Sequence, residues 1–140
     1  KHDVYEPQTT VQTVANAMDV SDPGNFVRLQ YLWNQYPSMK KIFSAHSVTD
    51  EDILKAIYDC WHEHHYLLDP HSATAWDILR KNGNGGLFMA TAHPQKFEDV
   101  IVKALGYFPK EWKRGYNSTE INRLNIDPDY SRVKNLLLGD

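Results

Sequence analysis

Hydrophobic residues recur at helical spacing in five stretches of the chain, and polar or proline-containing turns separate these stretches. The pattern predicts helices over 23–36, 50–65, 70–82, 94–105 and 128–137. The side chains expected to face inward are Phe26, Leu29, Trp33, Tyr36, Ile53, Leu54, Ile57, Tyr58, Trp61, Ala73, Trp76, Leu79, Phe97, Val100, Ile101, Ala104, Leu105, Val133, Leu136 and Leu137.

Capping residues support the predicted helix starts. Asp22–Pro23, Asp69–Pro70 and Asp127–Pro128 each place a carboxylate before a proline, which suits the N-cap and the first helical position. Thr49 and Asp52 resemble a capping box in which Asp replaces the usual Glu. We therefore expect each of these pairs to begin a helix.

Proline and glycine mark the predicted helix ends. Pro37 ends or kinks the first helix, and the run 83–86 (Gly-Asn-Gly-Gly) stops the third. Gly106 closes the fourth helix. The segment 107–127 has no clear period and is rich in aromatic and basic residues.

The apolar run 87–90 is the one convincing strand, and we expect it to be buried. A buried strand needs partners for its backbone donors and acceptors. A second strand lies within 9–20, around Val11, Val14 and Val20, or else polypeptide outside this chain completes the sheet. The run 66–68 is either a brief buried strand or a connection that faces the core.

These elements predict an α/β fold in which about five helices pack on a small sheet of one to three strands. The whole chain, 1–140, is expected to form a single domain. Within it, 1–17 is an extended lead-in, 18–106 is the α/β core, and 107–140 is an irregular segment with a final helix.

Composition places the chain among ordinary globular proteins. Hydrophobic residues make up 41% and charged residues 24%, and the formal net charge is −3. That charge does not favour a nucleic acid or an anionic membrane as partner, and no apolar run is long enough to span a bilayer. The one cysteine, Cys60, excludes an internal disulfide and fits a reducing, cytoplasmic compartment. Because the first residue is Lys1, we expect the chain to be part of a longer protein.

Thr91 and His93 lie where the predicted strand ends and the next helix begins. Ligands gather at such positions in open α/β sheets. Thr91 could present its hydroxyl to a ligand or cap the following helix, and His93 could be an acid, a base or a hydrogen-bonded scaffold residue.

The start of the third helix carries three more polar side chains, those of Asp69, His71 and Ser72. Free N–H groups at a helix start favour an anionic ligand. The structural alternative is that Asp69 or Ser72 caps the helix and His71 packs above it.

Histidines cluster at the end of the second helix. His62 and His64 are two residues apart, so they point in nearly opposite directions on a helix, unlike the i, i+4 pairs of zinc sites. Partly charged histidines also suit the negative pole of a helix. We therefore favour a solvated helix end over a metal site that would include His71.

Other familiar motifs are missing or weak. Lys96 is better explained as a solvated charge than as a Schiff-base lysine, and Cys60 lies on an apolar face that would leave it inert. The glycine-rich run 83–86 stands between a helix and a strand, which is the wrong order for a phosphate-binding loop. The sequence contains no nucleophile elbow and no dinucleotide fingerprint.

Three segments together resemble the C-terminal part of the threonine synthase family. They are Ala15–Val20 with Gly24–Phe26 and Arg28, then Leu67–Ala73, and finally Ala90–Phe97. Members of this family are pyridoxal-phosphate (PLP) enzymes of the tryptophan-synthase-β structural type, or fold type II. The resemblance covers about 10–105, although Gln95 stands where the family pattern has a small residue, and the loop 37–47 also differs.

The resemblance implies a carbon–oxygen lyase that converts O-phosphohomoserine and water to threonine and phosphate. In the family, the Schiff-base lysine and the loop that grips the cofactor phosphate lie in the N-terminal portion. This chain would therefore be inactive alone, would not hold PLP alone and would contain no catalytic residue of its own. Thr91 matches the hydroxyl that faces the cofactor's pyridine nitrogen, with Asp69, His71, Ser72 and His93 nearby.

Two other functions stay open on the sequence. The chain could be a non-enzymatic helical interaction module that docks through the patch 112–116, or a small metal hydrolase built on the histidines. If it is instead part of an enzyme, its partner is the N-terminal portion of the same protein. The apolar face left exposed should then also drive self-association.

Overall fold

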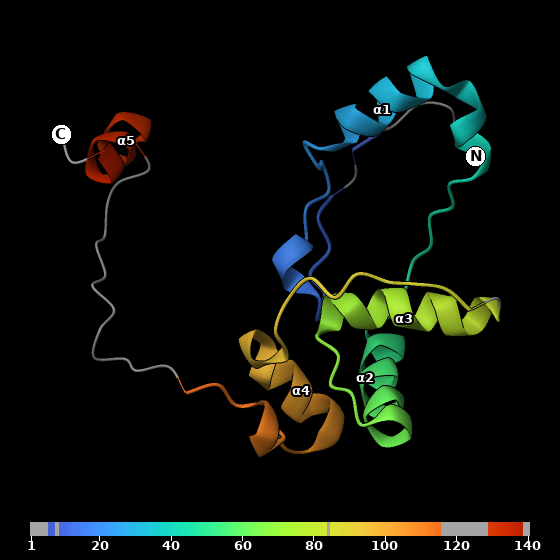
Figure 1. Cartoon of the computed structure of the whole chain (residues 1–140), viewed down its shortest axis with the longest axis vertical. Coiled ribbons are helices and arrows are strands. Elements are labelled where there is room, and N and C mark those ends of the chain that lie inside the picture. The colour runs from blue at the N-terminus through green and yellow to red at the C-terminus, as the bar shows by residue number, and fades with distance from the viewer. Residues whose placement is uncertain (1–5, 8, 84, 116–128, 139–140) are drawn as a thin grey trace.

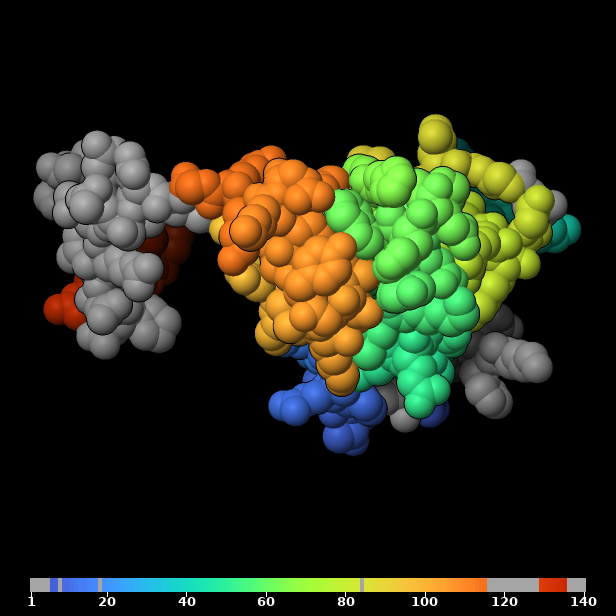
Figure 2. Space-filling model, turned by 90° about the horizontal axis from the view of Figure 1, so that it is seen from below, coloured from blue at the N-terminus to red at the C-terminus, as the bar shows by residue number. Residues whose placement is uncertain are grey.

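In the computed structural model, which describes residues 6–7, 9–83, 85–115 and 129–138, the chain is mostly helical. The α-helices are α1 (Phe26–Gln35), α2 (Asp50–His64), α3 (Pro70–Asn82), α4 (Glu98–Leu105) and α5 (Tyr130–Leu138). Short 3-10 helices are η1 (Asn16–Met18), η2 (Pro37–Lys41), η3 (Pro94–Phe97) and η4 (Lys110–Trp112). Helix α2 packs against both α3 and α4, and Figure 2 shows α2 and α4 side by side on one face.

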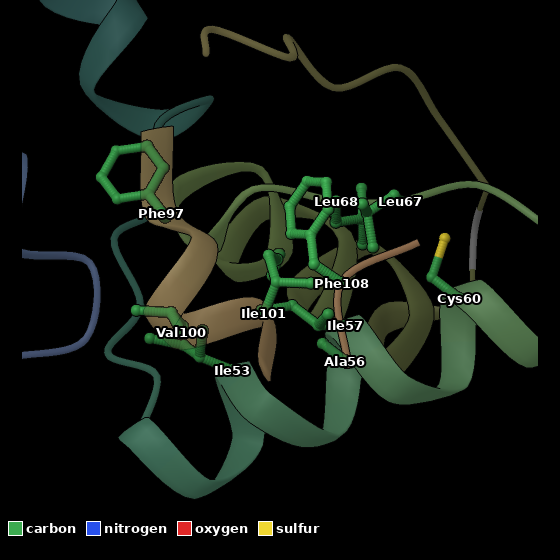
Figure 3. Packing of buried hydrophobic residues seen from close by; sticks show 11 residues of the cluster. Ile53, Ala56, Ile57, Cys60, Leu67, Leu68, Phe97, Val100, Ile101 and Phe108 are labelled. Carbon is green, nitrogen blue, oxygen red and sulfur yellow. The ribbon is translucent and has the colours of Figure 1, made fainter. Parts of the chain in front are cut away.

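The hydrophobic core lies between α2 and α4 and under the connection from α2 to α3 (Figure 3). The apolar stripe of α2, Ile53 with Ile57, meets Val100 and Ile101 of α4. Leu67 and Leu68 are almost completely buried, so the run 66–68 is a core-facing connection and not a strand. Phe108 also joins this core, so the segment after α4 is irregular but packed.

The predicted caps of α2 and α3 are confirmed. The Thr49 hydroxyl accepts a hydrogen bond from the Asp52 N–H, at 3.2 Å. Asp69 caps α3, and its carboxylate accepts from the N–H groups of His71 and Ser72. Gly83 ends α3 in the left-handed conformation that its sequence position predicts.

The starts of α1 and α5 differ from the sequence prediction. Helix α1 begins three residues after Pro23, with Asn25 as its N-cap, and the Pro23 carbonyl instead closes a turn with the Phe26 N–H. Helix α1 ends before Pro37, as expected. Asp127–Pro128 lie outside the described residues, and at α5 the Asp129 carboxylate accepts from the Arg132 N–H.

The expected small sheet is not confirmed, because the described residues contain no strand. The prediction that 87–90 is buried is wrong: Leu87 is 99% exposed and Met89 is 81% exposed. Val11 and Val20 are exposed as well, so 9–20 supplies no partner strand. An apolar extended segment is buried only when a neighbour covers it, and the described chain places none over these side chains.

The inward face of α3 also differs from the prediction. Ala73 is buried as expected, but Trp76 and Leu79 are only half-buried. Ser72 and Asp77 are buried on this face instead: the Ser72 hydroxyl bonds the capping carboxylate of Asp69, and Asp77 pairs with Lys81. Polar residues thus occupy part of the buried face of α3, where the spacing of apolar residues predicts only hydrophobic side chains.

Helix α1 and η2 pack on each other and stand apart from α2–α4, joined to them by extended segments on either side (Figure 1). Phe26, Trp33 and Phe43 form an edge-to-face row with ring centroids 5.7 and 6.3 Å apart. Neither α1 nor η2 contains a buried residue among those described.

Candidate functional site

Thr91 ends the extended apolar segment and is exposed at the surface. Its hydroxyl does not cap the following helix, because His93 is the N-cap of η3 and the His93 Nδ1 accepts from the Gln95 N–H at 3.3 Å. The structural alternative for Thr91, a cap of the following helix, is therefore wrong.

His93 is half-buried between η3 and the segment after α4. Its ring centroid lies 6.0 Å from that of Trp112. Because Nδ1 accepts a backbone hydrogen bond, the neutral ring carries its proton on Nε2. Burial lowers the pKa of His93, and the positive charges of Arg114 and Lys96 lower it further.

The Asp69 cluster at the start of α3 is buried and internally hydrogen-bonded. Asp69 is 1% exposed, and its carboxylate also accepts from the Ser72 hydroxyl and from the His71 Nδ1, the latter at 3.1 Å. The His71 ring lies 4.8 Å from the Phe97 ring of η3, with its Nε2 buried and without a partner in the described chain. The capping role expected for Asp69 and the packing role expected for His71 are both present.

Phe97 connects the two parts of the candidate site. Phe97 is the last residue of η3, the short helix that His93 caps, and its ring packs against the ring of His71 at the start of α3. The structure thus brings the loop 91–93 and the Asp69 cluster to neighbouring positions at one end of α3. Sequence spacing alone could not place them together, because residues 73–90 separate them.

The histidines at the end of α2 point to different neighbours. His62 stacks on Tyr58 with centroids 3.9 Å apart, and its Nδ1 donates to the Tyr58 carbonyl. His64 meets Trp76 and His65 meets Trp61, both edge to face. Within the described part of the chain, no group of three or more His, Cys, Asp or Glu residues is placed to hold a metal ion.

The remaining candidates fit their structural explanations. Cys60 is buried, and burial with the nearby Glu63 charge raises the pKa of its thiol to about 11, so it stays protonated at neutral pH. Lys96 is exposed. Trp112 is half-buried against Tyr66, with centroids 5.4 Å apart, so it is not a free docking side chain; Tyr116 lies outside the described residues.

Nothing in the sequence indicated the contact between Gln95, near His93, and the segment that follows α4. The Gln95 amide forms two hydrogen bonds with the backbone of Arg114, nineteen residues away. Gln95 stood out in the sequence only as a departure from a family pattern.

None of the helices found in the described residues is long and apolar enough to cross a membrane.

Comparison with known proteins gives a consistent result. No protein-family model matches the chain. It is 35% identical to a threonine synthase of Buchnera aphidicola subsp. Schizaphis graminum and 31% identical to that of Escherichia coli, in each case over 96% of this chain and 32% of the relative. The chain thus spans about a third of the length of the curated relatives that it matches.

Solved structures agree. The crystal structure of threonine synthase from Escherichia coli matches with a TM-score of 0.64 and 30% identity, over 97% of this chain and 33% of that one. A PLP-bound threonine synthase from Brucella melitensis matches with a TM-score of 0.62 and 28% identity, over 75% of this chain and 29% of that one. In both sequence and fold the chain is therefore similar to threonine synthases, and it spans about one third of their length.

Proposed function

We propose that this chain is the C-terminal portion of a PLP-dependent threonine synthase, a carbon–oxygen lyase that converts O-phosphohomoserine and water to threonine and phosphate. The observation that carries the proposal is the similarity of the chain to threonine synthases over 96% of its length, in which the exposed residue Thr91 ends the extended segment. We further propose a cytoplasmic location, in keeping with the free thiol of Cys60.

Thr91 fits a place beside the cofactor ring. PLP, when bound, supplies an electron sink for carbanion chemistry. A neutral hydroxyl facing the pyridine nitrogen does not force that nitrogen to stay protonated, as a carboxylate would. His93 caps η3 two residues after Thr91, and the Asp69 cluster, with His71 and Ser72, fixes the start of α3.

The extended segment 87–90 supports a partner from the rest of the protein. Leu87 and Met89 are exposed on an extended backbone, while Phe88 between them packs on the core. That alternation is typical of a strand with one covered face. We propose that a strand from the remaining two thirds of the protein pairs with this segment and completes the small sheet.

A chimera tests the proposed activity. The remaining two thirds of the Escherichia coli enzyme, joined to this chain, should bind PLP with its visible absorbance and release phosphate from O-phosphohomoserine. Thr91→Val should lower kcat about tenfold, the value of one hydrogen bond of about 1.4 kcal/mol, whereas Thr91→Ser should retain most activity. A chimera that folds but stays inactive, or stoichiometric PLP binding by this chain alone, would contradict the proposal.

A further inference from the structure

The segment that follows α4 returns to the turn that begins η3. Phe108 and Pro109 are buried, which ties the start of this segment to the hydrophobic core. After η4 the backbone becomes extended, with Lys113 at φ −76° and ψ 117°. We call residues 112–114 the strap, because they contact the turn from a distant part of the chain.

The far end of the strap is bonded by one side chain of the turn. The Gln95 Oε1 accepts from the Arg114 N–H at 2.7 Å, and the Gln95 Nε2 donates to the Arg114 carbonyl at 3.2 Å. In an extended backbone the N–H and C=O of one residue point to the same side, so a single primary amide can bond both. Lys113, one residue earlier, pairs instead with Glu98 at the start of α4, at 2.9 Å.

The near end of the strap contacts both parts of the candidate site. The Trp112 ring lies 6.0 Å from the ring of His93 and 5.4 Å from that of Tyr66, between ring centroids. Tyr66 begins the buried connection that leads to Asp69 at the start of α3. Trp112 therefore links the connection before α3 to the turn before η3.

The strap supplies a second side of support for η3. Pro94 and Phe97 are buried and tie one side of this short helix to the core. His93 and Gln95 are only half-buried, and they are the two turn residues that the strap contacts. Their own bond, from the Gln95 N–H to the His93 Nδ1, is long at 3.3 Å. The strap thus holds the side of the turn that the core does not reach.

We propose that Gln95 and Trp112 are positioning residues, which act through the strap to hold the turn and so set where Thr91 lies relative to the start of α3. The proposal rests on the proposed function only for the role of Thr91. The two contacts and their dependence on each other belong to this chain alone. If the strap acts as one unit, breaking its bond to Gln95 must also loosen its contact with His93.

NMR of the 140-residue chain tests this dependence, at about pH 8 so that His93 is neutral in every variant. Gln95→Met keeps the length of the side chain and removes both hydrogen bonds to Arg114. It should move the His93 ring signals toward those of Trp112→Leu, because the Trp112 ring current is lost as the strap moves away. Conversely, Trp112→Leu should quicken exchange of the Arg114 N–H about fivefold or more. Native His93 signals in Gln95→Met would overturn the proposal.

Two further variants separate the coupling from a general loss of stability. Trp112→Phe keeps an aromatic ring beside His93 and should leave the exchange of the Arg114 N–H close to native. Gln30→Met changes an exposed glutamine on α1 and should alter neither signal. Circular dichroism checks that each variant is folded. Equal exchange in Trp112→Phe and Trp112→Leu would show that the ring contact does not hold the strap, and would overturn the role of Trp112.

The chimera described above tests the consequence for Thr91. Gln95→Met should lower kcat about threefold, because the hydroxyl of Thr91 is displaced. In the Thr91→Val background the same substitution should have no further effect, since the group that it positions is gone. An equal loss in both backgrounds would mean that Gln95 acts only through the amount of folded protein, and would overturn its role. A native chimera without activity would contradict the proposed function alone, and the NMR experiment would still decide this inference.

Discussion

At the scale of single residues, the buried carboxylate of Asp69 is the most connected polar group of the candidate site. It caps α3 and accepts hydrogen bonds from two backbone N–H groups, from the Ser72 hydroxyl and from the His71 ring. Such a residue is identifiable from sequence because Asp-Pro before an apolar run is a local signal. Its bond to the His71 ring, by contrast, depends on how that ring packs on Phe97.

Asp69→Ala should lower the free energy of unfolding by about 1–3 kcal/mol, because the α3 cap is lost and buried donors are left without an acceptor. Urea denaturation followed by helical circular dichroism measures the change. Thr49→Ala, at the cap of α2, is the matched control and should cost about 1 kcal/mol. Equal losses for the two variants would show that the burial of Asp69 adds nothing to its capping role.

The free energy of unfolding should depend on the protonation state of Asp59. Burial opposes its charge, but hydrogen bonds from Lys55 and Arg80, the latter at 2.6 Å, outweigh that effect and lower the pKa of the carboxyl. A lowered pKa in the folded state means that the stabilisation is present above the ordinary value near 3.8 and is lost as the pH falls through the folded value.

We therefore expect the native chain to lose stability more steeply than Asp59→Asn as the pH is lowered from about 5 to 3. At neutral pH the variant should be less stable by about 1–2 kcal/mol. Asp52, whose pKa Lys81 and Thr49 also lower, is present in both proteins, so the difference between the two curves isolates Asp59. Parallel curves would contradict the role given to the ion pairs.

At the scale of elements, local signals predicted where most helices begin and end, but not what each face meets. Gly83 and Gly106 end α3 and α4 as expected. The start of α1 was misplaced because Asp22, Asn25 and the intervening proline offer competing caps within four residues. Asp77 lies in the buried face of α3, and its pairing with Lys81 at 2.7 Å explains how a carboxylate is tolerated there.

Gly83→Ala should destabilise the chain by about 1 kcal/mol, because Gly83 has φ of 68°, where a Cβ is strained even though open space surrounds it. Gly24→Ala is the control, since it also has open space but no positive φ, and it should change stability by less than about 0.5 kcal/mol. Thermal unfolding distinguishes the two. A neutral Gly83→Ala would mean that α3 ends without a left-handed residue.

The prediction that 87–90 is a buried strand is wrong about burial, and the reason also lies in how elements pack against one another. Apolar patterning shows that a segment is suited to a covered position, but it does not show which polypeptide covers it. The same limit applies to Gln95 and Arg114, whose contact depends on the path of the chain after α4. Contacts between distant residues leave no periodic trace in the sequence.

At the scale of the whole molecule, the exposed side chains of Leu87 and Met89 should drive self-association of this chain on its own. Light scattering at increasing concentration should show a rising mass. Leu87→Lys with Met89→Lys should keep the chain monomeric, whereas Gln12→Lys with Gln30→Lys adds the same charge elsewhere and should not. A native chain that stays monomeric at high concentration would contradict the prediction.

The arm formed by α1 and η2 has no share in the interior that α2 and α4 enclose, because none of its described side chains belongs to that cluster. Destabilising the arm should therefore leave α2 and α4 folded, and the arm and the core should unfold with separate free energies. Substitutions in the core cluster should therefore lower the stability of α2 and α4, whereas substitutions in the arm should leave it unchanged.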